Sequence, residues 1–196
     1  MKNIKLKFSF KGKRSYVQGP DIFDAVVDAL ALKEQSVKNI KYSAHNWIRN
    51  NATLILDPEE EIEKYDSLIT YYIEDVLHKA YVVDNGVKID SRSDYSEDYV
   101  FSNSEIEGDT IKLNYNTKGY TFSELVVSMN KCYMQDMHSE GKWIVTKFEY
   151  ATLDGIADYM TKDVTILLQK NLNNKLTKSE ILINNKPVGY IYFSLV

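Results

Sequence analysis

The chain has 196 residues, of which 44% are hydrophobic and 27% are charged, as in an ordinary globular protein. The formal net charge is −4 and the Lys and Arg residues are scattered, so the basic patch typical of a nucleic-acid-binding protein is missing. No apolar run approaches the roughly 20 residues that cross a bilayer, and residues 1–5 lack the apolar core of a signal peptide. We therefore expect a cytoplasmic protein with no membrane or nucleic-acid partner.

Three short segments recur in the same order along the chain. Ile4–Phe8 resembles Ile111–Tyr115, Asp24–Val27 resembles Glu124–Val127, and Tyr81–Gly86 resembles Ile181–Lys186. The second and third pairs share an offset of 100 residues. This ordered recurrence indicates two diverged units, residues 1–105 and 106–196. The alternative is that apolar strands and Asn-rich turns look alike in any protein.

The first unit is predicted to contain a strand, a helix and several further strands. Gly19 and Pro20 favour the start of a helix that runs to about Leu32, because Pro is common at the first helical position. A strand is expected at 37–42, a short acidic helix at 58–66 and another strand from about residue 68. The Asn-Gly pair within 84–86 predicts a tight turn that joins the segments 81–83 and 87–89 into a closing hairpin.

The second unit is predicted to repeat this plan. A polar linker is expected at 91–109, in which Tyr99–Phe101 could add a short strand. Thr121 to Glu124 fits a capping box that opens the second helix. A strand follows at 143–150, and a hairpin closes the unit with strands at 181–183 and 188–193 around a turn at 184–186.

A strand, one central helix and antiparallel strands that end in a hairpin resemble the hotdog fold of acyl-thioester dehydratases and thioesterases. The resemblance lies in element order over nearly the whole chain, not in a specific motif. It implies an α+β protein of two hotdog-like units, each a central helix wrapped by an antiparallel sheet, which form an internal pseudo-dimer. It also implies that an acyl-CoA or acyl carrier protein thioester binds at the interface of the two units, with no other cofactor.

Asp24, Glu124 and His45 are the candidate catalytic residues. The resemblance to dehydratases of this family implies a His of one unit that works with an acid on the other unit's helix. In this sequence, however, no His lies between the first strand and the helix of either unit. A thioesterase needs only an acid that activates water and helix-start amides that hold the thioester carbonyl. Structural roles compete: Glu124 completes the capping box, Asp24 lies on an acidic helix face, and His45 has no partner visible in sequence.

The segment Lys13–Gly19 is extra in the first unit, because the first repeat pair is offset by 107 residues and the second by 100. A segment that leads into a helix start is a natural substrate loop. Arg14, Tyr16, Gln18 and Gly19 are therefore the candidate substrate-binding residues, and Arg14 is expected to meet a phosphate of coenzyme A or pantetheine. A simple extension of the first strand is the alternative.

No reaction is specified by a motif. The sequence has three His residues without a metal-ligand spacing, so no metal site is expected. The single cysteine, Cys132, excludes an intrachain disulfide and is expected to be a small buried hydrophobe on the second helix. Three hypotheses stay open: an acyl thioesterase or dehydratase-like enzyme, a non-catalytic binding or accessory protein on the same scaffold, and an unrelated α+β binding domain. A homo-oligomer is compatible with each.

Overall fold

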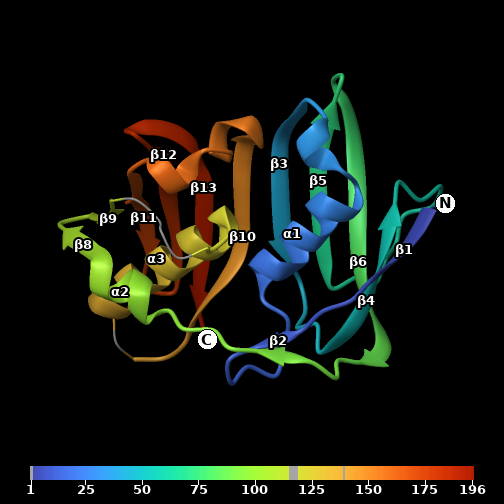
Figure 1. Ribbon diagram of the computed structural model, residues 1–196, viewed down its shortest axis with the longest axis horizontal. Helices are drawn as coiled ribbons and strands as arrows, with labels where there is room; N and C mark the ends of the chain where they lie inside the picture. The colour runs from blue at the N-terminus through green and yellow to red at the C-terminus, as the bar shows by residue number, and fades with distance from the viewer. Residues whose placement is uncertain (1, 115–118, 139) are drawn as a thin grey trace. The chain divides into compact units, whose positions relative to one another are not determined.

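The computed structural model describes residues 2–114, 119–138 and 140–196. The chain forms two compact units, Met1–Ser96 and Glu97–Val196, each with one main helix lying against its own sheet (Figure 1). The boundary lies before the predicted one after residue 105. Residue 115, the last of one predicted repeat segment, lies outside the described residues.

The sheet of unit 1 has five antiparallel strands in the order β1-β4-β6-β5-β3. Their bounds are β1 Lys2–Leu6, β3 Val37–Ala44, β4 Asn50–Leu56, β5 Ser67–Ile73 and β6 Val76–Lys88. A separate parallel pair joins β2 (Phe10–Lys11) to β7 (Arg92–Ser93). The strands predicted at 37–42 and from residue 68 are confirmed.

Helix α1 of unit 1 runs from Gly19 to Ala29, with Pro20 in its first turn as predicted. It ends before the predicted Leu32, because Ala31 adopts a left-handed φ of 50° and a short 3-10 helix, η1 (Leu32–Glu34), follows. Its apolar face, which includes Ile22, Phe23 and Val26, is buried. Burial of such side chains contributes about 25 cal/mol per Å2 of apolar surface removed from water.

The predicted closing hairpin of unit 1 is wrong. Residues 81–89 do not fold back at Asn85-Gly86, because β6 runs on through them as one long strand to Lys88. Ala52 of β4 pairs with Asp84 of β6, and Asn50 pairs with Lys88. The register therefore shifts between these two pairs, and the β6 residues after Asp84 form a bulge. A turn within 84–86 is thus replaced by a bulge, since β4 offers hydrogen-bond partners on both sides of it.

The real tight turn of unit 1 joins β5 to β6 at Glu74 and Asp75, which have φ values of 49° and 62°. Two consecutive positive φ values are the signature of the turn type that matches the twist of a two-residue hairpin. The predicted helix at 58–66 is also wrong, because these residues form an irregular connection from β4 to β5. The acidic pattern there reflects an exposed loop and not a helix start.

Unit 2 has an antiparallel sheet in the order β10-β13-β12-β11-β9-β8. The strands are β8 Ser104–Glu107, β9 Thr110–Leu113, β10 Trp143–Thr152, β11 Val164–Leu172, β12 Leu176–Ile183 and β13 Lys186–Leu195, and 3-10 turns follow β10 as η2 (Asp154–Ile156) and η3 (Tyr159–Thr161). The strand predicted at 143–150 is confirmed. The hairpin predicted at the end of the chain is also confirmed, with Asn184 and Asn185 at positive φ in its turn.

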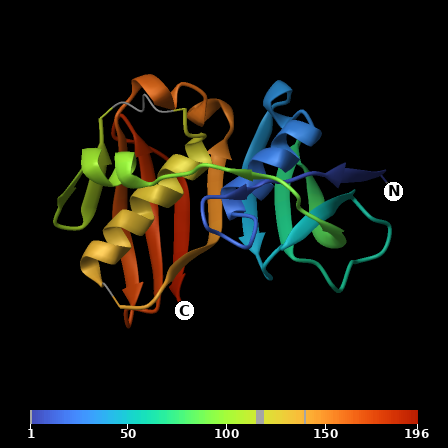
Figure 2. The ribbon, with the colours of Figure 1, turned by 60° about the horizontal axis from the view of Figure 1, so that its bottom comes forward.

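Helix α3 (Phe122–Met137) packs on β9, β10, β11 and β13 of its own unit and lies across that sheet in Figure 2. Its buried face includes Leu125, Val126 and Met129. The predicted linker at 91–109 is more ordered than expected. Asp98–Asn103 form helix α2, which contacts α3, so Tyr99–Phe101 are helical and not a strand.

The two units share five sheet positions but connect the strands differently. In unit 1 the last strand, β6, lies between β4 and β5, whereas in unit 2 the last strand, β13, lies between β12 and β10. The repeat segments 81–83 and 181–183 nevertheless occupy the same position, two strands in from β1 and from β9. The predicted correspondence therefore holds for position in the sheet and fails for the hairpin that follows.

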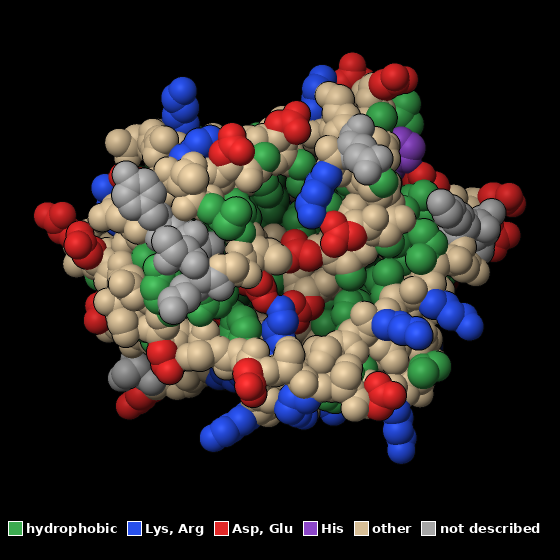
Figure 3. Space-filling model, viewed as in Figure 1, with side chains coloured by type: hydrophobic (Ala, Val, Ile, Leu, Met, Phe, Trp, Pro, Cys, Tyr) green, Lys and Arg blue, Asp and Glu red, His purple; other side chains and the backbone are tan. Residues whose placement is uncertain are grey.

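On the face of the molecule in Figure 3, basic and acidic side chains are interspersed. This mixture is typical of a solvated surface that carries no strong field of one sign. Within the described ranges, no helix is long and apolar enough to cross a membrane.

Candidate functional site

The start of α1 is built by the close approach of Gly19 to Tyr42 of β3. A Cβ atom at Gly19 would lie 3.0 Å from a ring carbon of Tyr42, so a larger residue there would push the ring away. The Tyr42 hydroxyl lies 3.2 Å from the Ser67 hydroxyl of β5. Burial raises the pKa of Tyr42 to about 12, against the opposing effect of the Ser67 hydrogen bond. Tyr42 is therefore a neutral phenol beneath the helix start.

Gln18 is the N-cap residue of α1, and its side chain is 8% exposed. Its side chain does not cap the helix, and its Nε2 atom has no hydrogen-bond acceptor in the part of the chain that the structure describes. A buried donor without an acceptor costs about 1–3 kcal/mol of folding free energy. The structure thus places a buried amide donor at the N-terminus of α1.

The segment before α1 is held by the β2–β7 pair and by ring contacts. The Arg14 guanidinium lies over the Tyr95 ring, with its carbon 5.0 Å from the ring centroid. Arg92 Nη1 donates hydrogen bonds to the carbonyl oxygens of Gly12 and Arg14. Tyr16 packs edge-on against Trp47, with 4.3 Å between ring centroids. Of the predicted substrate residues, Gln18 and Gly19 lie at the helix start, while Arg14 and Tyr16 pack on other aromatic rings.

Asp24 is half-buried and lies beyond the first turn of α1, because the helix already begins at Gly19. Asp21, and not Asp24, is the acidic residue in the first turn. The Asp21 carboxylate pairs with the Lys11 ammonium at 2.5 Å. Lys11 of β2, just before the extra segment, is thereby tied to the helix start.

Glu124 forms the predicted capping box at the start of α3. Its carboxylate accepts a hydrogen bond from the Thr121 backbone N–H at 2.9 Å, while its own N–H donates to the Thr121 hydroxyl at 3.2 Å. The side chain is only 6% exposed. This arrangement accounts for Glu124 structurally and leaves its chemical role to be tested.

Tyrosines gather around the start of α3. The Tyr150 hydroxyl donates to the Ser123 hydroxyl at 3.4 Å, and the Tyr159 hydroxyl donates to the Tyr120 carbonyl. Burial, assisted by the carboxylates of Glu124, Glu97 and Asp98, raises the pKa of Tyr120. Further along α3, Asn130 is fully buried and neither amide atom has a hydrogen-bond partner among the described residues.

His45 follows β3, and its ring packs edge-on against Tyr65 with 4.7 Å between centroids. Across the residues that the structure describes, the His45 side chain makes no hydrogen bond and no ion pair. Burial raises the pKa of the Cys132 thiol, and the carboxylates of Asp136 and Glu97 add to this effect. A raised pKa lowers the thiolate population, which argues against a nucleophilic Cys132. No group of three or more metal-ligating side chains occurs within the described ranges.

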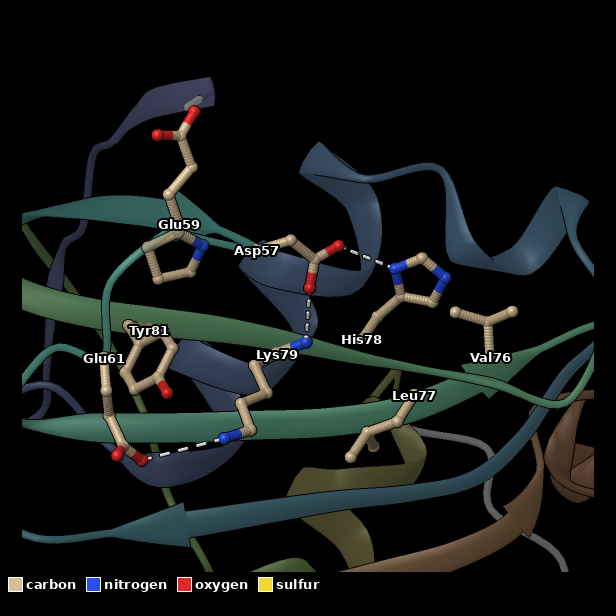
Figure 4. Close-up of a pocket in the computed structure, with 9 residues that line it drawn as sticks. Asp57, Glu59, Glu61, Val76, Leu77, His78, Lys79 and Tyr81 are labelled. Atoms are coloured by element: carbon tan, nitrogen blue, oxygen red, sulfur yellow. Dashed lines mark hydrogen bonds and ion pairs between the residues drawn. The ribbon is translucent and has the colours of Figure 1, made fainter.

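A pocket of about 450 Å3 lies in unit 1 where β4 ends and β6 begins (Figure 4). Its lining residues are Asp57, Pro58, Glu59, Glu61, Val76, Leu77, His78, Lys79 and Tyr81. Asp57 Oδ2 lies 2.6 Å from His78 Nδ1, and Asp57 Oδ1 accepts the Lys79 backbone N–H at 2.7 Å. The Lys79 ammonium lies 3.7 Å from the Glu61 carboxylate.

No protein-family model matches the sequence, and no curated protein matches it with significance. Solved structures match it over almost its full length. A protein from Novosphingobium aromaticivorans, assigned as a thioesterase, has a TM-score of 0.54 at 7% identity, with 99% of this chain and 94% of that chain covered. The dehydratase domain of PpsC from Mycobacterium tuberculosis, solved in complex with C12:1-CoA, has a TM-score of 0.53 at 7% identity, with 99% and 92% covered. The pyran synthase domain from module nine of the sorangicin pathway gives 0.54 at 7% identity, with 99% and 92% covered.

The chain has the hotdog fold. The prediction from element order is thus confirmed. The likeness is one of fold alone at this identity, so the role of each residue in either unit has to be argued from its own surroundings.

The Asp57–His78 pair in unit 1 was not predicted from the sequence. Asp57 directly precedes the helix predicted at 58–66, and His78 has no partner nearby in the sequence. The two residues are 21 positions apart and meet only because β4 and β6 are neighbours. One signal for this pair was available in the sequence. Asp57 directly follows the apolar strand β4, and His78 lies in β6, which is the second strand after β4 along the chain.

Proposed function

We propose that this hotdog protein binds an acyl thioester of coenzyme A or of an acyl carrier protein, with the thioester carbonyl at the start of α1. The single observation that carries the proposal is the buried Gln18 amide, whose Nε2 donor has no acceptor among the described residues. A carbonyl oxygen is the acceptor that this donor lacks. The helix N-terminus adds partial positive charge at the same place.

The fold supports this choice of ligand. A structural neighbour over 99% of the chain, the PpsC dehydratase domain, was solved in complex with C12:1-CoA. The implied pseudo-dimer of the two units, and the ligand site at their interface, stay predictions. So does the contact of Arg14 with a ligand phosphate.

Gln18→Leu tests the binding site. Removal of an unsatisfied buried donor is expected to leave the free energy of unfolding unchanged or raised. Affinity for a medium-chain acyl-CoA, measured by isothermal titration calorimetry, should fall about threefold to tenfold, as expected for one lost hydrogen bond. Gln169→Leu is the control, because Gln169 is exposed and lies in unit 2. Equal affinities of the parent and Gln18→Leu would contradict the proposal.

A second candidate, hydrolysis or dehydration of the bound thioester, is tested separately from binding. Gln serves as well as Glu in a capping box, so Glu124→Gln should keep the stability of α3 while it removes a carboxylate base. Asp24→Asn likewise removes the Asp24 carboxylate. His45→Gln removes the His45 imidazole. If thiol release from acyl-CoA substrates occurs and none of these variants lowers its rate, the three residues are not catalytic. If no thiol is released, hydrolysis is excluded for these substrates. Dehydration removes water from the acyl chain and keeps the thioester, so it needs its own assay, and the binding function stands alone only if that assay is negative as well.

A further inference from the structure

Two polar side chains lie in the core of unit 2 without a hydrogen-bond partner. Asn130 of α3 and Ser179 of β12 are both 0% exposed. Neither amide atom of Asn130, nor the Ser179 hydroxyl, makes a hydrogen bond to any residue that the structure describes. Fully buried polar groups of this kind are rare in folded proteins, and where the chain offers no partner they are usually bonded to ordered water.

One contact shows where α3 lies along β12. The Thr177 hydroxyl of β12 donates to Met134 Sδ of α3 at 3.4 Å. Asn130 is one helical turn before Met134 and therefore lies on the same face of α3. Ser179 is two residues after Thr177 and lies on the same buried face of β12. Both unpartnered side chains therefore belong to the layer between the helix and the sheet.

A second contact gives the direction in which α3 crosses the sheet. Near the start of the helix, the Tyr150 hydroxyl of β10 donates to the Ser123 hydroxyl at 3.4 Å. Tyr150 is aligned through β13 with Ile181 of β12. A step back along α3 thus corresponds to a step forward along β12, and Asn130 lies over Ser179.

The side chains around this pair are large and apolar. Val126, one turn before Asn130 on α3, is fully buried. Ile191 of β13 and Phe148 of β10, which continue the row of Ser179 across the sheet, are fully buried as well. Asn and Ser are shorter than these neighbours, and protein cores are close-packed, so a small neutral molecule is the natural filler between the two.

The unmet hydrogen bonds define what this molecule must be. Asn130 Oδ1 accepts, Asn130 Nδ2 donates, and the Ser179 hydroxyl can do either. A bare cation or anion satisfies only one of the two amide atoms, whereas water donates and accepts at once. Since both residues are fully buried, the molecule must also be as small as water.

We propose that Asn130 and Ser179 bind one ordered water molecule, which links α3 to β12 inside the core of unit 2. The water donates to Asn130 Oδ1, accepts from Asn130 Nδ2 and makes its third hydrogen bond with the Ser179 hydroxyl. It thereby fixes on its sheet the helix that carries Glu124. The site is independent of the acyl-thioester site proposed at α1, because it lies in the other unit and shares no residue with it.

A high-resolution crystal structure of the full chain tests the site directly. An ordered water is expected within about 2.7–3.2 Å of both Asn130 Nδ2 and Ser179 Oγ. A direct hydrogen bond between the two side chains, or a map with no water between them, would overturn the proposal.

Asn130→Leu gives a test whose sign depends on the water. Leu is chosen because Leu30 stands at the repeat-equivalent position, 100 residues earlier. If the water is bound, this variant loses it and leaves the Ser179 hydroxyl unpartnered, so the urea midpoint of unfolding falls. If the amide has no partner at all, its removal relieves an unsatisfied buried group and the midpoint rises. A raised or unchanged midpoint would therefore contradict the proposal.

Ser179→Ala removes the other partner of the water and should also lower the midpoint. The double variant should be no less stable than the less stable single variant, because the same water is lost in each. Thr177→Val is the control on the same face of β12. Its hydroxyl is bonded to Met134, so its effect should add to that of Asn130→Leu. Additive losses for Asn130→Leu and Ser179→Ala would count against a shared water, whatever the result of the acyl-CoA titrations.

Discussion

Glu124 and Gln18, which both lie at helix starts, differ in whether a structural role already accounts for the side chain. Glu124 was predicted both as a helix cap and as an acid, and the capping box is present with both of its hydrogen bonds. Gln18 was predicted as a substrate-binding residue, and its side chain makes no cap. The residue that is not needed by the helix is therefore the better candidate for ligand binding.

Cys132 gives a pH-dependent prediction at this scale. Burial and the nearby carboxylates raise the pKa of its thiol above the ordinary value of 9.0. Since the thiolate is the reactive form, alkylation by iodoacetamide at pH 7 should be slower in the folded protein than in the same protein in denaturant. The rate in the folded state should rise as the pH passes 9. Faster alkylation of the folded than of the denatured protein at pH 7 would restore Cys132 as a nucleophile candidate.

Asp84 links a residue to the bulge in β6. Burial raises the pKa of its carboxyl, but hydrogen bonds from Gly86 N, Arg49 N and the Asn50 side chain and backbone outweigh burial and lower the pKa below 3.8. These bonds hold the chain where a hairpin turn was predicted. The backbone N–H of Gly86 in the Asn-Gly pair donates a hydrogen bond there to the Asp84 carboxylate. Local sequence preferences do not reveal this bond.

A depressed pKa contributes stability above the unfolded pKa, and that contribution is lost as the pH falls through the folded pKa. Asp84→Asn should therefore lower the free energy of unfolding at pH 7. The difference from the parent should shrink once the pH falls below about 4. Urea unfolding at pH 7 and at pH 3 measures both differences. A difference that does not change between the two pH values would contradict the assigned role of the Asp84 charge.

The pairing of β10 with β13 depends on a glycine. A Cβ atom at Gly189 would overlap the carbonyl oxygen of Glu149 in the facing strand. Gly189→Ala should therefore lower the free energy of unfolding by about 3 kcal/mol or more, because backbone and not a flexible side chain must move. Gly86→Ala is the control, since Gly86 has open space around it and only a φ of +72° to strain. It should cost about 1–2 kcal/mol, and a larger loss in Gly86→Ala than in Gly189→Ala would be contrary to the packing argument.

At the scale of the whole molecule, the chain consists of two compact units, each with its own buried core. Phe23 of α1 and Phe148 of β10 are both almost fully buried, in unit 1 and unit 2 respectively. The units also differ in the order of their last two strands. Both units therefore have a helix packed on an antiparallel sheet, but the chain connects the last two strands of each sheet in a different order.

Removal of a core ring should act mainly within its own unit. Phe23→Ala should lower stability by about 3–5 kcal/mol. In hydrogen-exchange mass spectrometry, protection should fall first in peptides of unit 1, and Phe148→Ala should give the converse pattern. Equal loss of protection in both units for either variant would mean that the two cores unfold as one.

The sequence alone determined the features that depend on near neighbours. The starts of α1 and α3, the alternation of most strands and the Asn184-Asn185 turn follow from local preferences, and each was predicted correctly. The tertiary structure decided which strands pair, and with that whether residues 84–86 form a turn or a bulge. It also decided that Asp57 meets His78, because a hydrogen bond between two strands depends on register, and register is set by the packing of the whole sheet.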